Sequence, residues 1–232
     1  MGTLTDDIAI RRRALLGRDC SMGRRCLSTF LLLTAIAWTG LITVDTEAHG
    51  AEPAGKVTRL AGAAEVSSKG ATTALKVGDA VAIGNVLSTA MDSRLELTMV
   101  DGATITLGPA AVLEIEDYLF DSGKGNGILR LAKGALQAVS GQLVQLTDKP
   151  FKVTGPIATI GIRGTTFFVG DIDDTFGVFL IEGSSVSVSN AAGSVDLLRP
   201  GFGTTVPPGQ APEAPRQWAP DKIQRSLDLT EF

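Results

Sequence analysis

The sequence holds few residues that could carry out catalysis. It has 232 residues but one histidine, His49, and two cysteines, Cys20 and Cys26, all before residue 51. The rest of the chain therefore offers no Ser-His-Asp triad, no thiol nucleophile, no disulfide and no histidine-bound metal. We predict no catalytic residues and no cofactor, and we expect that the protein is not an enzyme.

Basic charge is also scarce outside the N-terminus. Residues 1–26 carry six arginines against three aspartates, whereas from residue 51 onward 15 Lys and Arg stand against 20 Asp and Glu. A protein that binds nucleic acid needs clustered Lys and Arg to neutralise phosphates. The mildly acidic body argues against a nucleic-acid partner.

A long apolar run follows the N-terminal arginines. Leu27 to Val44 contains no charged residue, and residues 45–51 follow it with the letters "DTEAHGA". This pattern predicts a secretory signal in residues 1–50, cleaved after Ala48 or Gly50. The run also reaches the lower limit for a membrane span. We therefore expect a periplasmic or secreted protein, with an inner-membrane anchor at 27–44 and the body outside as the alternative.

Residues 56–206 show the alternation typical of β-strands. In "RLELTMV" (94–100) Leu95, Leu97 and Met99 share one face, and Asp101-Gly102, a strong hairpin signal, follows. Turn residues recur every seven to ten positions. We predict an all-β fold over residues 51–206, an irregular coiled β-solenoid-like or rolled sheet of many short strands, with a β-sandwich as the alternative.

Two segments and the C-terminus depart from this alternation. Residues 157–169 and 176–181 are apolar on both faces, which predicts strands near the centre of the fold. Residues 207–232 contain five prolines and form a predicted tail. Its last 12 residues could form a short amphipathic helix, which would need a surface to dock on.

Two groups of carboxylates are the remaining candidates for chemistry. Asp171, Asp173 and Asp174 form a short Asp-rich turn whose oxygens suit Ca²⁺, although such turns also occur without metal. Glu114 and Glu116 share a strand face, as a carboxylate-based hydrolase acting on glycans would require. We favour the simpler interpretation of both groups as hairpin-turn and surface residues.

Two motifs resemble the FecR domain family. The first lies in residues 75–115 and includes Gly78, Asp79, Asp101, Gly102 and Gly108; the second is "TGPIATIGIRGTTFFV" (154–169), with Gly161, Arg163, Gly164 and Thr165. The resemblance spans roughly residues 56–190. It implies an extracytoplasmic all-β domain without enzymatic activity. In the best-known members this domain transmits a signal from an outer-membrane iron transporter to a cytoplasmic sigma factor.

Arg163 is the unusual residue of the second motif. It stands between Gly161 and Gly164 in an apolar segment. An unpaired buried charge is too costly, so we predict that Arg163 is paired or bound to backbone carbonyls and holds the fold together.

The motifs and the export signal lead to a functional expectation. The 26 residues before the apolar run lack the pattern of an anti-sigma helical region, and only the Pro-rich tail follows the domain. We therefore expect a non-enzymatic binding or scaffold module of the cell envelope, whose partner is an envelope or extracellular protein or a glycan. The alternative is a membrane-anchored signalling regulator of the iron-responsive sigma-factor type.

Overall fold

A computed structural model describes residues 52–121, 124–146 and 151–232 of the chain. The predicted export signal or anchor at 1–50, including the apolar run at 27–44, lies outside these residues. Within the described residues, no helix is both long and apolar enough to cross a membrane.

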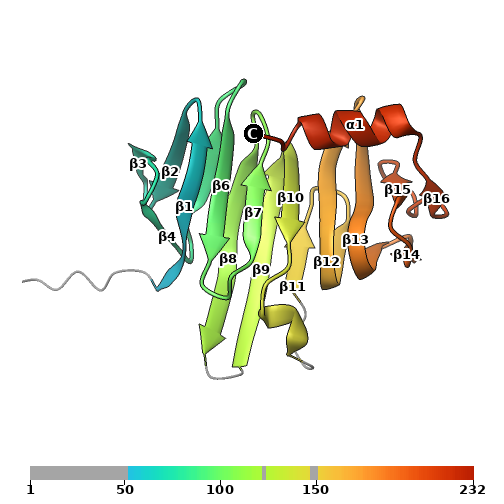
Figure 1. Ribbon diagram of the computed structural model, residues 1–232, viewed down its shortest axis with the longest axis horizontal. Helices are drawn as coiled ribbons and strands as arrows, with labels where there is room; N and C mark the ends of the chain where they lie inside the picture. Colours follow the sequence, from blue (N-terminus) through green and yellow to red (C-terminus); the bar gives the residue numbers. More distant parts are fainter. Residues whose placement is uncertain (1–51, 122–123, 147–150) are drawn as a thin grey trace, which may run out of the picture. The chain divides into compact units, whose positions relative to one another are not determined.

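The described chain is a β protein with a short C-terminal helix (Figure 1). The strands are β1 (Pro53–Ala61), β2 (Ala64–Ser68), β3 (Ala71–Ala74), β4 (Ala80–Ala82), β5 (Val86–Thr89), β6 (Arg94–Met99), β7 (Thr104–Leu107), β8 (Val112–Asp121), β9 (Lys124–Lys133), β10 (Ala135–Val139), β11 (Phe151–Thr154), β12 (Thr159–Ile172), β13 (Thr175–Asn190), β14 (Gly193–Leu197), β15 (Phe202–Val206) and β16 (Arg216–Gln217). A 3₁₀ turn, η1 (Leu143–Gln145), precedes β11, and α1 (Pro220–Asp228) follows β16.

Strand pairing forms one strongly curled sheet. Its main path runs β3-β2-β5-β8-β9-β11-β12-β10-β7-β6-β1-β4, and β13 to β16 branch from β12. The first half of β12 pairs with β11 and its second half with β10. This one strand therefore joins two wings of the sheet, one made of β3-β2-β5-β8-β9-β11 and the other of β10-β7-β6-β1-β4. The predicted rolled sheet is thereby confirmed, rather than a sandwich of separate sheets.

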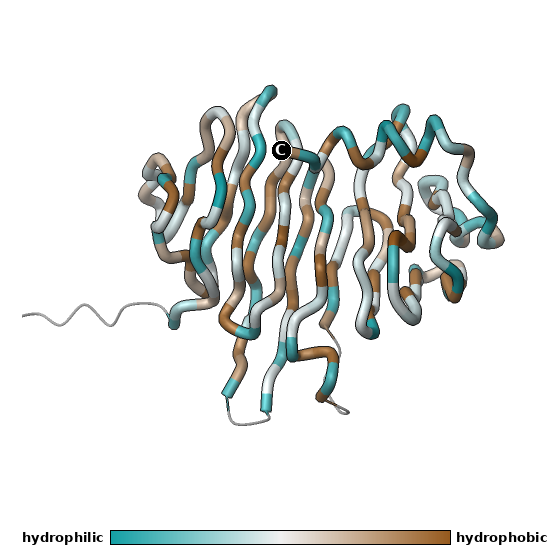
Figure 2. Tube along the Cα trace, viewed as in Figure 1, coloured by the Kyte–Doolittle hydropathy of each residue, from teal (hydrophilic) through white to brown (hydrophobic). Residues whose placement is uncertain are grey.

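The inward faces of the strands meet in one apolar core. Leu95, Leu97 and Met99 of β6 are buried, as their alternation predicts, and β7 returns antiparallel after the Asp101-Gly102 turn. Figure 2 shows hydrophilic and hydrophobic residues alternating along many strands. One cluster of buried side chains draws on both wings and on β12 and β13. Burial of this shared apolar face is the dominant favourable term in the stability of the fold.

Burial on both faces is confirmed for only part of the two segments for which it was predicted. In β13, residues 176–180 are all buried, and in β12 so are residues 167–170. The N-terminal half of β12 instead alternates, with Ile160 and Ile162 inside and Arg163 exposed. The outer faces of the two doubly buried segments are covered by the C-terminal tail, which the sequence pattern of β12 cannot reveal.

The tail packs on the sheet through a second apolar cluster. Ala135, Phe168, Ile172, Phe179 and Trp218 are buried together, and Ile223 and Leu229 pack against them. The rings of Phe179 and Trp218 are stacked with their centroids 5.0 Å apart. The helix expected near the C-terminus is therefore present as α1, and its docking surface is the outer face of β10, β12 and β13.

Candidate functional site

Asp101 of the first motif is the polar centre of the fold. Its carboxylate is buried; Oδ1 accepts hydrogen bonds from the Ala103 amide (3.0 Å) and the Tyr118 hydroxyl (2.8 Å), and Oδ2 accepts one from the Leu143 amide (3.0 Å). These bonds join the β6–β7 turn to β8 and to η1. Gly141 is required beside them, because an added Cβ would lie 2.4 Å from Asp101 Oδ2.

Tyr118 is the partner that motif reasoning missed. It is 1% exposed, and burial together with the nearby Asp101 carboxylate, both by its charge and by their hydrogen bond, raises the pKa of its phenol far above the ordinary value. The hydroxyl is therefore a permanent donor to Asp101. Strict alternation from Leu113 and Ile115 would place Tyr118 on the outer face of β8. A bulge between Ile115 and Asp117 moves Tyr118 to the inner face instead.

The other residues of the first motif shape turns and close contacts. Gly78 has a φ of +96°, and Asp79 accepts a hydrogen bond from the Lys76 amide at 2.8 Å. The Asp79 carbonyl also accepts one from the Val57 amide, which ties this turn to β1. At Gly108 an added Cβ would lie 2.8 Å from the carbonyl oxygen of Leu229, at the end of α1.

The second motif forms the bend at which β12 passes from one wing to the other. Pairing with β11 ends at Ile162 and pairing with β10 begins at Thr166. Ser140 fills the gap: its amide and hydroxyl donate to the Thr165 carbonyl (3.1 and 2.7 Å), and its Oγ accepts from the Thr165 amide (3.0 Å). Gly164, with a φ of +61°, provides the left-handed conformation that the bend needs.

The prediction that Arg163 is buried and paired is wrong. Its side chain is exposed, and it makes no hydrogen bond or ion pair with any residue that the structure describes. The bend explains the difference: the inward face passes from Ile160 and Ile162 to Thr165 and Phe167, and Arg163 stays outside. Gly161 is likewise on the open side, since the nearest atom to an added Cβ would be 3.9 Å away.

A cleft of about 730 Å³ opens beside Arg163. Its walls are residues 139–141, 144–145, 163–166 and 182–185. Thr165 is among the lining residues, but its hydroxyl is buried on the inward side of β12 and has no hydrogen-bond partner among the described residues. We call this space the Arg163 cleft.

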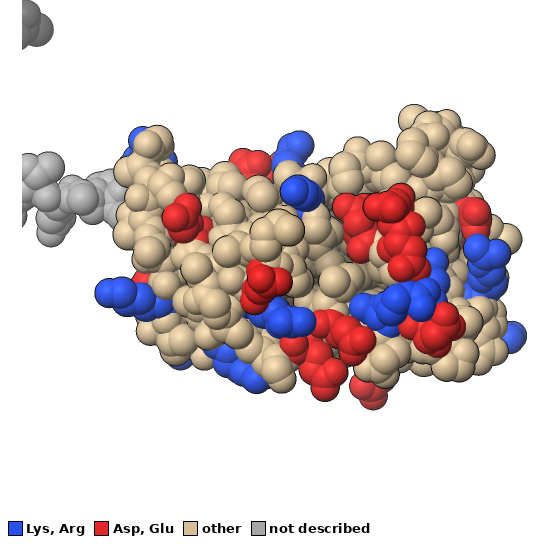
Figure 3. Space-filling view, turned by 90° about the horizontal axis from the view of Figure 1, so that it is seen from above, with Lys and Arg blue, Asp and Glu red and all other residues tan. Residues whose placement is uncertain are grey.

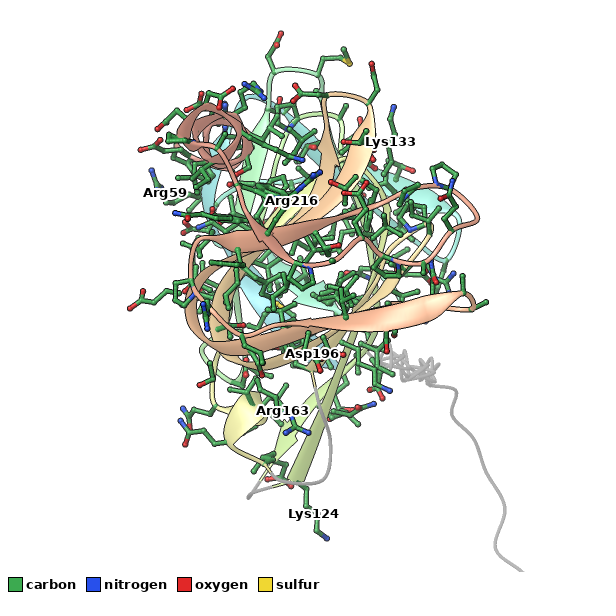
Figure 4. All side chains as sticks on the ribbon, turned by 90° about the vertical axis from the view of Figure 1, so that its right-hand side faces the viewer. Arg59, Lys124, Lys133, Arg163, Asp196 and Arg216 are labelled. Atoms are coloured by element: carbon green, nitrogen blue, oxygen red, sulfur yellow. The ribbon has the colours of Figure 1, made fainter. Side chains whose placement is uncertain are left out.

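A second hollow lies on the other side of the same guanidinium. It has a volume of about 430 Å³ and is lined by Gly161, Ile162, Arg163, Ser185, Ser187, Asp196 and Leu198. Figure 4 shows Arg163 and Asp196 with other side chains on this end of the domain. Arg163 is thus the shared border of two neighbouring hollows.

The Asp-rich turn connects β12 to β13 and contacts α1. Asp173 and Asp174 have φ values of 51° and 60°, the conformation of a two-residue hairpin turn. Asp173 Oδ2 accepts a hydrogen bond from Arg225 at 2.8 Å, while burial and the charge of Asp174 raise the pKa of Asp171. Among the described residues, no group of three or more His, Cys, Asp or Glu side chains could hold a metal ion, so the calcium candidates are not brought together as a ligand set.

Glu114 and Glu116 are brought together, but around a cation. Both carboxylates pair with Arg130 of the neighbouring strand β9, Glu114 at 3.6 Å. The Arg130 guanidinium therefore occupies both of the carboxylates that a hydrolase would need to act on its substrate. This arrangement supports the simpler interpretation of a surface ion-pair group.

Charges of both signs alternate on the face that carries α1. Figure 3 shows Lys and Arg interspersed with Asp and Glu there. Among these charges, Arg225 of α1 pairs with Asp173 and Asp221. Such a face offers no continuous basic stripe to a nucleic-acid backbone.

Comparisons with known proteins agree with the motif resemblance. Residues 85–185 match the family model described as "FecR protein", a range that contains both Asp101 and the Arg163 bend but not Gly78 and Asp79. No curated protein matches the sequence.

Two solved structures from Parabacteroides distasonis are partly similar to this chain. Two crystal structures of a proposed anti-sigma factor, at 1.65 and 2.50 Å resolution, are 18% and 17% identical, each with a TM-score of 0.48. The alignment covers 60% of this chain and 62% of each of those, so it spans less than two thirds of their length.

Proposed function

We propose that this chain, which carries a FecR domain at residues 85–185, is a non-enzymatic regulator that acts on a sigma factor through protein contacts. The family match is the observation that carries the proposal. It favours the signalling role, which stood as the alternative in the sequence analysis, over a general scaffold of the cell envelope.

The geometry of the domain is consistent with a binding function. The charged groups best placed for catalysis serve the fold instead: Asp101 accepts three buried hydrogen bonds, and Glu114 and Glu116 pair with Arg130. The exposed cation of the family motif, Arg163, borders two hollows and has no partner in the described chain. A fixed scaffold with an unpaired charge at a cleft suits recognition of another protein.

The proposed arrangement places the FecR domain outside the cytoplasm. The apolar run at 27–44, preceded by arginines, would serve as an anchor with residues 1–26 in the cytoplasm. In that arrangement the domain receives the signal and the N-terminal segment contacts the sigma factor. A cleaved signal would leave the exported domain without a cytoplasmic segment, and would return the scaffold role to first place.

Crosslinking in the source cells tests this proposal. The full-length chain would carry a C-terminal affinity tag, and mass spectrometry would identify the proteins crosslinked to residues 1–26 and to the β domain. We expect one sigma factor among the partners of the N-terminal segment, and we expect deletion of the gene to alter the transcripts of that sigma factor. If no sigma factor is crosslinked and the transcripts stay the same, the regulatory role is wrong.

A further inference from the structure

We infer that the Arg163 cleft is the contact site for the partner of this domain, and that it takes an extended peptide segment with one carboxylate between apolar residues. The inference rests on the proposed function only in assuming a protein partner. Four features of the cleft carry it: the free guanidinium, the fixed backbone beneath it, the apolar residues on both sides and the acidic residues nearby.

The guanidinium has unused binding capacity. It offers five N–H donors in a planar fork that matches a carboxylate, and it makes no hydrogen bond or ion pair in the described chain. Other arginines of the domain do pair: Arg130 with two glutamates, Arg216 with Glu213 and Arg225 with two aspartates. A bidentate carboxylate would give Arg163 the kind of partner that these arginines already have.

The bend holds the base of Arg163 in place. Three hydrogen bonds between Ser140 and Thr165 fix the backbone beside it. The guanidinium therefore projects from a backbone segment that is held in one position.

Apolar side chains are exposed on both sides of the guanidinium. Val139, in the wall of the Arg163 cleft, is 43% exposed, and Leu198, in the neighbouring hollow, is 66% exposed. Each could bury apolar area against a partner residue that flanks a carboxylate. The expected partner segment is therefore apolar, acidic, apolar.

Acidic residues of the two hollows limit the charge of the ligand. Glu182 lines the Arg163 cleft and Asp196 lines the second hollow, and both are exposed. One carboxylate can pair with Arg163, whereas a phosphate or a run of acids would also be repelled by these two groups. This balance favours a peptide with a single acidic residue over nucleic acid or an anionic lipid surface.

Selection from a peptide library tests the inference directly. The probe is a phage-displayed library of random nonapeptides, selected on the full-length chain. We expect the enriched peptides to share one Asp or Glu with apolar neighbours. A synthetic copy of the best peptide would then be titrated against each variant by fluorescence anisotropy.

Matched variants separate the cleft from general charge. Arg163→Ala should weaken peptide binding about tenfold to hundredfold, the range for a lost hydrogen bond to a charged group. Arg163→Lys, which keeps the charge but loses the fork, should recover part of the affinity, and Leu198→Ser should weaken binding by a smaller factor. Arg216→Ala, which removes an exposed arginine from another part of the surface, should change nothing.

Several results would overturn the inference. They are enrichment of peptides without an acidic residue, no enrichment at all, binding that Arg163→Ala leaves intact, or a glycan-array signal that depends on Arg163. Thermal melting of Arg163→Ala checks that this variant is folded. We expect its Tm to match that of the parent protein, because the side chain is exposed and has no partner in the described part of the chain. Failure of the sigma-factor crosslinking with a positive peptide result would remove the regulatory role and leave the cleft in place.

Discussion

Replacing Tyr118 with phenylalanine removes one hydroxyl from the polar centre of the fold. The Asp101 carboxylate then keeps the amides of Ala103 and Leu143 but loses the hydrogen bond from Tyr118, which is 2.8 Å long. A buried hydrogen bond to a charged acceptor contributes about 1.5–3 kcal/mol. We expect Tyr118→Phe to lower the free energy of unfolding at pH 7 by about 2 kcal/mol, and the Tm by about 4–8 °C.

The same side chain makes stability depend on alkaline pH. Burial and the Asp101 carboxylate raise the pKa of Tyr118 in the folded protein far above its ordinary value of 10.0, so above pH 10 the unfolded chain loses a proton that the folded chain keeps. The unfolded state then binds fewer protons, and stability falls as pH rises. At pH 11 this costs the parent protein about 1.4 kcal/mol, a cost that Tyr118→Phe does not have.

Chemical denaturation at pH 7 and pH 11 measures both effects. The difference in unfolding free energy between parent and variant should shrink from about 2 kcal/mol to less than about 1 kcal/mol. Ser67→Ala is a matched control, since it removes a hydroxyl that is hydrogen-bonded to Thr72 at the exposed surface; it should cost less than about 0.5 kcal/mol at either pH. An unchanged gap between pH 7 and pH 11 would refute the argument that Tyr118 stays protonated in the fold.

Three further predictions concern the bend, the tail and the N-terminus. Gly183→Ala should lower the free energy of unfolding more than Gly164→Ala does, by at least about 2 kcal/mol in thermal melts. An added Cβ at Gly183 would lie 2.3 Å from the Gly164 carbonyl oxygen, whereas an added Cβ at Gly164 would meet open space. Equal losses of stability in the two variants would contradict this prediction. Trp218→Ala should cost about 3–5 kcal/mol and expose the outer face of β10, β12 and β13 to a hydrophobic dye, and a small loss without dye binding would show that the tail is not part of the folded unit. Mass spectrometry of the protein from its source cells should find an intact N-terminal segment if residues 27–44 anchor it, and a new N-terminus at residues 49–51 would instead establish a cleaved signal.

The sheet was largely predictable because strand alternation is a local property. Leu95, Leu97 and Met99 alternate with polar residues, and the Asp101-Gly102 turn follows, so both β6 and the hairpin could be located from the nine residues 94–102. Tyr118 could not be placed this way, because the bulge at Glu116 reverses the phase of β8. The available signal was that Tyr118, the one tyrosine of the sequence, does not fit the alternation of Leu113 and Ile115. A tyrosine in such a position could have been considered for an inward polar contact.

The predicted burial of Arg163 failed for a related reason. Its neighbours are apolar, which locally favours a buried strand, but the change of inward face at the bend depends on two different strands, β10 and β11, pairing with the two halves of β12. Trp218 was also missed, although a tryptophan in a Pro-rich tail signals a docking contact. Its partners Phe168 and Phe179 lie far away in sequence.

Composition and period therefore determined the class of this protein: a β fold without histidine or cysteine after residue 50, held together by an apolar core. Those properties depend only on residue composition and on patterns among neighbouring residues, so they can be read from an unfolded chain. Tertiary structure decided which charged groups remain available for binding. Asp101 accepts hydrogen bonds from a turn, a strand and a 3₁₀ turn, whereas Arg163 has no partner among the residues that the structure describes, because the sheet bends beneath it.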